Sequence, residues 1–175
     1  MRTMLYVEVA VVLICGLGAV PLRATDFTFG TISTLNCDGK IPGNPTAFGV
    51  TSFSFVSTHA AQIDPTHLKN LAPATLGDVV VTKVIDRCSP DLFVEMAQGI
   101  VLPNVKFSWT NSDTHLTWLT ITLENAQVTA DNYSLANESV SFSWTRITIH
   151  FVITKDDGTA GGVVERSWNR LTNSQ

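Results

Sequence analysis

Apolar and polar positions alternate with a period of two over most of the chain. In residues 27–35 and 47–56, apolar side chains alternate with glycine, serine or threonine, as is typical of a strand with one face in the core. The pattern returns in residues 105–110, 115–128, 139–153 and, more briefly, 163–168. A polar bend is expected at residues 131–137. We therefore predict a mainly all-β domain whose strands are joined by polar turns.

One stretch in the middle of the chain breaks this rule. Residues 78–85 are rich in β-branched side chains and contain no proline or glycine. This composition favours a buried strand. Ser89 and Pro90 then predict a helix start and cap, because a serine oxygen can accept an orphan backbone N–H and proline is tolerated in the first turn. Apolar residues recur at helical spacing up to a glycine, so we predict one short helix over about 90–98.

The longest polar segment, residues 57–77, exceeds the usual length of a connection in a compact domain. Long loops of this kind often carry function, so we interpret it as an interaction arm. The alternative is that it contains a helical turn at residues 65–71. The candidate subunit-contact residues of this loop are His59, Gln62, Asp64, His67, Lys69 and Asn70.

The first 24 residues differ from the rest of the chain. Arg2 precedes an apolar stretch, and Ala24 offers a small residue at a cleavage position, so we interpret residues 1–24 as a secretory signal peptide. This predicts a secreted or periplasmic product with residues 25–175 as a single domain. The alternative is an uncleaved membrane anchor, since residues 5–22 approach the length that spans a bilayer.

Loss of this leader would also remove Cys15 and leave two cysteines, Cys37 and Cys88. An even pair in a chain sent to an oxidising compartment is consistent with a disulfide. Two buried thiols that pack as small hydrophobic groups are the alternative. Spacing alone does not distinguish them, because bridging depends on geometry in space.

Charge and motif content exclude several classes of function. The chain has 11 Lys and Arg against 15 Asp and Glu, scattered along its length, so it offers no basic surface for nucleic acid. Phosphate-binding, dinucleotide-binding, nucleophile-elbow and zinc-protease motifs are missing from the sequence. The four histidines lie far apart without carboxylates at ligand spacing. We expect a non-enzymatic protein with no catalytic, cofactor-binding or metal-binding residues and no small-molecule substrate.

Two motifs resemble those of a known family. Residues 82–90, TKVIDRCSP, are similar to a Thr-Lys-x-x-Asp-x-x-Ser-Pro motif that leads into a helix. Residues 38–43, DGKIPG, resemble an Asp-Gly-Ile-Pro-Gly turn with Lys40 inserted. With the order of the predicted strands, these motifs make residues 29–173 similar to the haemolysin-coregulated protein (Hcp) family, the tube protein of type VI secretion.

This resemblance implies a β-barrel of two antiparallel sheets with the short helix on its side. It also implies a homo-hexameric ring, stacking of rings into a tube, and contact with secretion spike or effector proteins. The resemblance implies a type VI tube subunit, whereas the leader departs from the family pattern and favours an exported ring-forming paralogue; we expect one of these two. The alternative is an exported β-barrel binding module unrelated to secretion.

Overall fold

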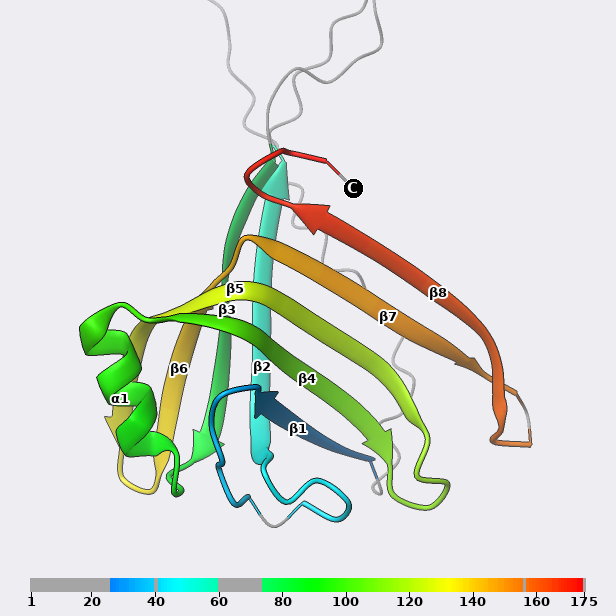
Figure 1. Ribbon diagram of the computed structural model, residues 1–175. Coiled ribbons are helices and arrows are strands. Elements are labelled where there is room, and N and C mark those ends of the chain that lie inside the picture. The colour runs from blue at the N-terminus through cyan, green and yellow to red at the C-terminus, as the bar shows by residue number, and fades with distance from the viewer. Residues whose placement is uncertain (1–25, 40, 60–73, 156, 175) are drawn as a thin grey trace, which may run out of the picture.

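A computed structural model describes residues 26–39, 41–59, 74–155 and 157–174 (Figure 1). Within these ranges the chain forms eight strands and one helix, which confirms the prediction of a mainly β domain with one short helix. The elements are β1 (Asp26–Ile32), β2 (Phe48–His59), β3 (Ala74–Val84), α1 (Ser89–Gln98), β4 (Val101–Asn111), β5 (Thr117–Ser134), β6 (Asn137–Ser143), β7 (Arg146–Thr154) and β8 (Ala160–Asn169). The predicted signal peptide lies outside the described residues.

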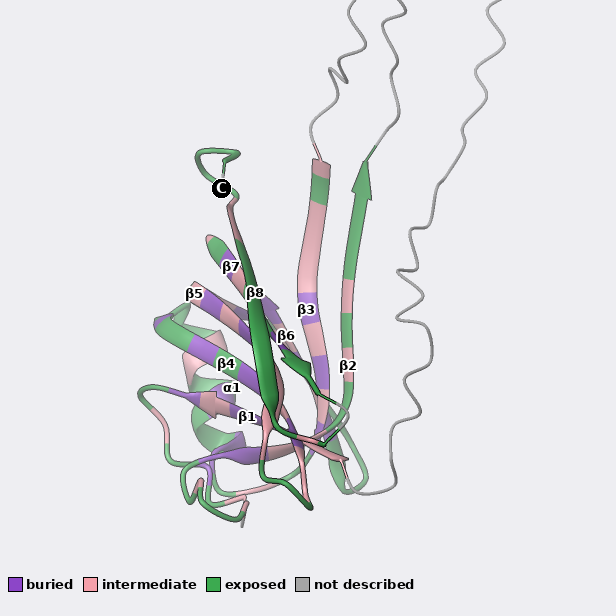
Figure 2. Cartoon of the chain, turned by 90° about the vertical axis from the view of Figure 1, so that its right-hand side faces the viewer, coloured by how far each residue is buried: buried purple, intermediate pink, exposed green. Residues whose placement is uncertain are grey.

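The strands form one continuous antiparallel sheet rather than two separate ones. Their order is β4-β1-β2-β3-β6-β5-β7-β8, and an additional pairing of β4 with β5 closes the first six into a barrel. The length of β5 allows this, because its first half pairs with β4 and β7 and its second half pairs with β6. The barrel is flattened into two layers, with β2 and β3 in one and β4, β5, β7 and β8 in the other (Figure 2).

The run 139–153, predicted as one strand, is two strands, and the prediction was wrong at this point. Thr145 turns the chain because its backbone N–H donates to the Glu124 carbonyl at 3.1 Å and its Oγ1 donates to the same oxygen at 3.0 Å. Arg170 N–H donates to the Thr145 carbonyl at 2.8 Å. These bonds redirect the chain from β6 to β7 without a glycine or proline.

Two predicted connections include residues that are in strands. β5 continues to Ser134 and β6 begins at Asn137, so the bend expected at 131–137 shrinks to a tight hairpin turn. Likewise, β2 extends to His59 and β3 begins at Ala74, so both ends of the predicted loop 57–77 are strand. Most of the polar side chains in the described parts of both segments are exposed positions of paired strands, which sequence polarity alone does not distinguish from a loop.

The core lies between the two layers and is centred on aromatic contacts. The Phe107 ring on β4 meets Phe48 and Phe53 on β2 edge-on, with ring centroids 6.4 and 5.3 Å apart. It also meets Phe142 on β6 at 6.0 Å. Phe48, Phe107 and Phe142 are fully buried. Edge-to-face packing of this kind stabilises beyond the area buried, so Phe107 links the layers.

β1 and β2 form the shortest pairing among the described strands. It consists of two residue pairs, Phe29 with Gly49 and Gly30 with Phe48. The Phe48 ring lies over Gly30, where an added Cβ would come within 2.2 Å of the ring Cζ. This glycine therefore gives the core ring the space that it needs at the closure of the barrel.

We predict that Gly30→Ala destabilises the fold by about 1–3 kcal/mol, because the methyl group overpacks the buried Phe48 ring. Gly49→Ala is the matched control in the same pairing, since its nearest non-neighbouring atom, Ile41 Cδ1, would lie 3.9 Å away. That change should stay within about 0.5 kcal/mol. Urea unfolding of both variants measures the difference. Equal losses of stability would contradict this account of the β1–β2 pairing.

Candidate functional site

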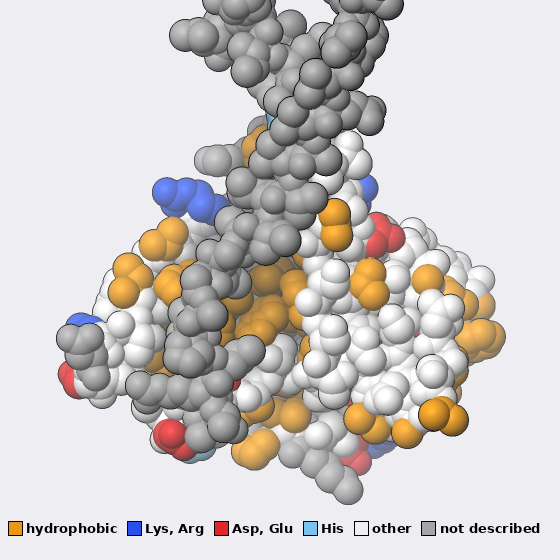
Figure 3. All heavy atoms as spheres, turned by 180° about the vertical axis from the view of Figure 1, so that it is seen from behind, with side chains coloured by type: hydrophobic (Ala, Val, Ile, Leu, Met, Phe, Trp, Pro, Cys, Tyr) orange, Lys and Arg blue, Asp and Glu red, His pale blue; other side chains and the backbone are white. Residues whose placement is uncertain are grey.

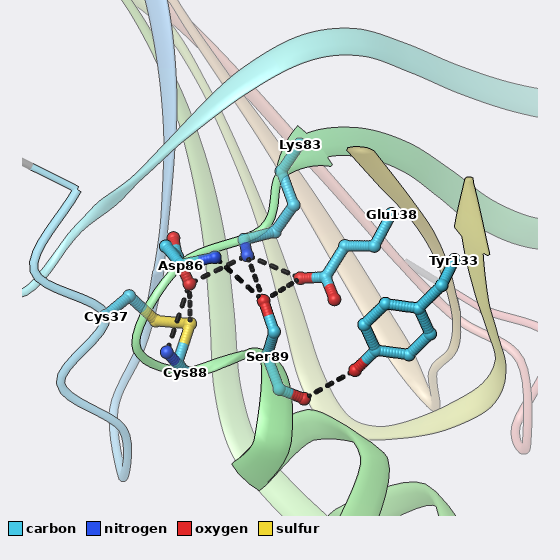
Figure 4. Close-up of a disulfide and its surroundings, with 7 residues drawn as sticks. All are labelled: Cys37, Lys83, Asp86, Cys88, Ser89, Tyr133 and Glu138. Atoms are coloured by element: carbon cyan, nitrogen blue, oxygen red, sulfur yellow. Dashed lines mark hydrogen bonds and ion pairs between the residues drawn. A yellow bond between two sulfur atoms is a disulfide. The ribbon is translucent and has the colours of Figure 1, made fainter. Parts of the chain in front are cut away.

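A buried disulfide ties the chain together at one end of the barrel. Cys37, in the β1–β2 connection, is joined to Cys88, which directly precedes α1 (Figure 4). Their Cα atoms are 4.5 Å apart, and 51 positions separate them in sequence. Both side chains are fully buried. The bridge therefore lies within the core and is shielded from solvent.

Beside the disulfide lies a polar group of Lys83, Asp86, Ser89 and Glu138, here named the Lys83 cluster (Figure 4). The Lys83 ammonium pairs with Glu138 Oε1 and with Asp86 Oδ1, the latter at 2.8 Å. It also donates to Ser89 Oγ at 3.2 Å and lies 5.6 Å from the centre of the Phe48 ring. Lys83 is 0% exposed and Glu138 is 1% exposed. The cluster thus joins β3, β6 and the start of α1.

Ser89 is the connecting residue of the cluster. Its hydroxyl donates to Glu138 Oε1 at 2.8 Å and accepts the Asp86 backbone N–H at 3.0 Å. Its carbonyl accepts a hydrogen bond from the Tyr133 hydroxyl at 2.9 Å. Asp86 Oδ1 in turn accepts the Cys88 backbone N–H at 3.0 Å, which links the cluster to the disulfide.

The prediction that Ser89 caps the helix was wrong. Cys88 takes the N-cap position, and no side-chain cap hydrogen bond is present among the described residues there. The Ser89 hydroxyl instead donates to the buried Glu138 carboxylate, and its oxygen accepts from Lys83 Nζ and the Asp86 backbone N–H rather than from a helix N–H. A hydrogen bond to a charged carboxylate is stronger than one between neutral groups. Pro90 lies in the first turn, as expected, and Gly99 ends the helix with a φ of 64°.

The sequence carries a signal for Lys83 and Glu138, because both fall on the core-facing positions of an alternating strand pattern. Lys83 continues the core-facing alternation of Val79 and Val81, and Glu138 begins the alternation that leads to Val140 and Phe142. In the sheet, Lys83 and Glu138 are direct cross-strand partners. Opposite charges at core-facing positions of two strands are the signal that predicts such a pair.

The electrostatics next to the cluster are dominated by carboxyl groups. Burial raises the pKa of the Asp131 carboxyl, and the nearby Glu138 carboxylate raises that pKa further. Neither Asp131 oxygen makes a hydrogen bond within the described part of the chain. Burial of the Tyr133 hydroxyl, together with the Asp131 and Glu138 charges, raises the pKa of Tyr133 to about 12. Tyr133 therefore remains a hydrogen-bond donor at neutral pH.

These properties indicate a structural site. Lys83, Ser89 and Glu138 are at most 1% exposed, so their side chains do not line an open binding site. Within residues 26–39, 41–59, 74–155 and 157–174, no three His, Cys, Asp or Glu side chains come together as metal ligands. No helix in those ranges is both long and apolar enough to cross a bilayer.

The predicted subunit-contact loop falls mostly outside the described residues. His59 is the last residue of β2. The other five candidates, Gln62, Asp64, His67, Lys69 and Asn70, belong to the part that the structure does not describe.

A second candidate site is the open edge of the sheet, formed by β8. Among the described strands β8 pairs with β7 alone. Its Val163 and Val164 are 56% and 45% exposed. The adjacent strand β7 exposes Ile149, Phe151 and Ile153. Figure 3 also shows hydrophobic side chains gathered in a hollow of the face seen from behind. Apolar side chains beside an unpaired edge are typical of a surface that meets a partner.

The family model described as "Type VI secretion system effector, Hcp" matches residues 35–151. The chain belongs to the Hcp family. Both cysteines and the complete Lys83 cluster lie inside the matched range. The family prediction made from the two sequence motifs is thereby confirmed.

Solved structures share the Hcp fold. Hcp1 from Salmonella typhimurium aligns with a TM-score of 0.70 at 18% identity over 86% of this chain and 98% of its own. A structure described as a type six secretion system protein aligns with a TM-score of 0.76 at 17% sequence identity, over 86% of this chain and 99% of its own. A type VI secretion system effector from Yersinia pestis aligns with a TM-score of 0.63 at 19% sequence identity, over 81% of this chain and 98% of its own. No curated protein sequence matches the chain.

We predict that Lys83→Met lowers the free energy of unfolding by about 3–5 kcal/mol, because it leaves Glu138 as an unpaired buried charge. The double variant Lys83→Met/Glu138→Leu should recover most of this loss, since apolar groups of similar size then replace the ion pair. Lys106→Met, on the exposed side of β4, is the control and should change stability by no more than about 0.5 kcal/mol. Failure of the double variant to recover would show that the cluster does more than satisfy its own charges.

Asp131→Asn should stabilise the protein at neutral pH. The pKa of Asp131 is raised in the folded state above its ordinary value of 3.8, so the folded state favours the protonated form and ionisation costs stability as pH rises. The advantage of the asparagine variant should therefore disappear below that ordinary value. Denaturant unfolding as a function of pH measures it.

Asp157→Asn provides a control of opposite sign. Hydrogen bonds from Thr159 hold the pKa of the exposed Asp157 carboxyl below its ordinary value. That variant should lose a little stability at neutral pH and none in acid. If both asparagine variants showed the same pH dependence, the assigned cause of the Asp131 shift would be wrong.

Proposed function

We propose that this Hcp-family chain is a non-enzymatic structural protein whose copies form hexameric rings. The rings stack into a type VI secretion tube or form an exported ring-like assembly. The observation that carries this proposal is the open edge, where Val163 and Val164 are exposed on a strand that, among the described strands, pairs on one side only. Soluble monomers usually protect such edges, so a second copy is the natural cover.

Ring closure requires a heterologous contact, in which two different surfaces of the subunit meet. The second surface is offered by β2, which pairs with β1 at Phe48 and Gly49. Among the described strands, no strand pairs with residues 51–58 on that side. The open edge of one copy and the free side of β2 in the next can add to each other repeatedly. Such head-to-tail addition closes into a ring when the rotation fits.

Stacking would use the hairpin of β2 and β3, which runs beyond β1, β4 and β6 (Figures 1 and 2). Its outer end is a two-stranded ribbon in which Ser57, Thr58 and His59 pair with Leu76, Thr75 and Ala74. A projecting ribbon can reach a neighbouring ring. Spike or effector proteins are the further partners that membership of the Hcp family supports.

Export to the periplasm or beyond is part of the proposal. Residues 1–24 have the features of a cleavable signal peptide that would leave residues 25–175 as the single mature domain. The Cys37–Cys88 bridge supports the same compartment independently, because structural disulfides persist in oxidising surroundings.

We predict that mature chain recovered from the periplasm begins at Thr25 and forms a discrete six-subunit species in native mass spectrometry. Val164→Lys should abolish it, because the added charge lies on the open edge. Val94→Lys on α1 is the matched control, since Val94 is 46% exposed against 45% for Val164. A monomeric wild-type chain at high concentration would reject the ring and favour an exported binding module.

A further inference from the structure

We infer that the Cys37–Cys88 disulfide is a redox-controlled clamp on the β2–β3 hairpin, closed by oxidation after export and required before copies assemble. The link to assembly rests on the proposed function. The clamp itself rests on the position of the disulfide in the fold and is tested separately below.

The disulfide closes a covalent loop that contains the hairpin. Cys37 precedes β2, and Cys88 follows β3, so both strands lie between the two cysteines. The bridge thus joins the chain entering the hairpin to the chain leaving it. Both sulfurs lie at the end of the barrel where β2 begins and β3 finishes (Figure 4).

The hairpin has few other constraints on its entry side. β2 pairs with β1 through two residue pairs. Its ladder with β3 has irregularities between Val50 and Ser52 and between Phe55 and Ser57. β3 is supported by β6 from Val79 onward, so the outer end of the hairpin is two-stranded among the described residues. Two-stranded ribbons are marginally stable in water, which makes the anchoring of their base important.

The two cysteines differ in how firmly the protein holds them. On the exit side, the Cys88 N–H is bound by Asp86, whose carboxylate pairs with Lys83. On the entry side, the hydrogen bonds of Cys37 N–H to Thr46 and of Gly39 N–H to Ala47 stay within the β1–β2 connection. The disulfide therefore transmits the rigidity of the Lys83 cluster to a connection that its own hydrogen bonds leave separate from α1.

The clamp closes by thiol–disulfide exchange with an oxidised dithiol oxidoreductase, the class of oxidant found in exporting compartments. One cysteine thiolate attacks the oxidant's disulfide to form a mixed disulfide, and one oxidant sulfur leaves as a thiolate. The second cysteine thiolate attacks its partner's sulfur, forming the Cys37–Cys88 bond and releasing the second oxidant thiolate. Two electrons pass to the oxidant, and the two cysteine protons pass through solvent to its thiolates.

Burial makes the closed clamp persistent. Both cysteines are 0% exposed, so an oxidant forms the bond, and a reductant breaks it, only while the local structure is open. In a reducing compartment the same chain retains the Lys83 cluster but lacks the link to the entry side. The compartment thus selects whether the hairpin base is fixed.

The test compares three samples. They are the oxidised mature chain, the same chain reduced during a mild denaturant pulse and then refolded with its thiols still reduced, and the double variant Cys37→Ala/Cys88→Ala. Hydrogen exchange is followed in β2 and β3, with β4 and β5 as the internal control. We expect reduction and the double variant to remove protection selectively from β2 and β3, and re-oxidation of the reduced chain to restore it. Unchanged exchange in β2 and β3, or equal loss in all four strands, would overturn the clamp.

Native mass spectrometry of the same samples tests the link to assembly. We expect the six-subunit species in the oxidised chain and its loss on reduction and in the double variant. A ring that persists unchanged on reduction would overturn the control of assembly. A monomer in every sample, with selective loss of protection on reduction, would reject the proposed ring while leaving the clamp supported.

Discussion

The ion pair between Lys83 and Glu138 is the constraint on which the rest of the structure depends. It fixes the register of β3 on β6, because the two residues are cross-strand partners in line with the pairs Val81–Val140 and Val79–Phe142. A slip of one residue would turn the buried valines outward and separate the charges. Leaving either charge buried alone costs several kcal/mol, so the pair rejects alternative registers even if it adds little to net stability.

From this pair the order of the fold extends outward through a few polar contacts. Ser89, in the first turn of α1, donates a hydrogen bond to Glu138. Asp86 pairs with Lys83 and accepts the backbone N–H of Cys88. The disulfide then reaches Cys37 and the β1–β2 connection. One end of the barrel is therefore firmly tied. Among the described strands, β8 and residues 51–58 of β2 each have a strand neighbour on one side only. Under the proposed function, these two strand edges are the surfaces through which copies of the chain would assemble.

The sequence pattern predicted strands well where apolar residues alternate toward the core. It predicted them poorly where the paired strand residues are polar and exposed to solvent. The division of 139–153 into two strands was missed because the turn at Thr145 is made by side-chain and backbone bonds to Glu124 and carries no glycine or proline. The family motif contained Lys83, Asp86 and Ser89, but their role depends on Glu138, 55 positions from Lys83. Phase marks both charges as inward-facing, whereas only the sheet register shows that they meet.

The two ties at this end of the barrel respond to different conditions, and this separates folding from assembly. The Lys83 cluster joins β3, β6 and α1 through charges and hydrogen bonds that do not depend on redox state. The disulfide adds the β1–β2 connection only where oxidants are present. An exposed apolar edge such as β8 is an aggregation hazard whenever a complementary edge is ready to receive it. In the proposed scheme, the Lys83 cluster sets the sheet register without the disulfide, and the base of β2 is fixed only after export. The two edges would then not pair in the compartment where the chain is made.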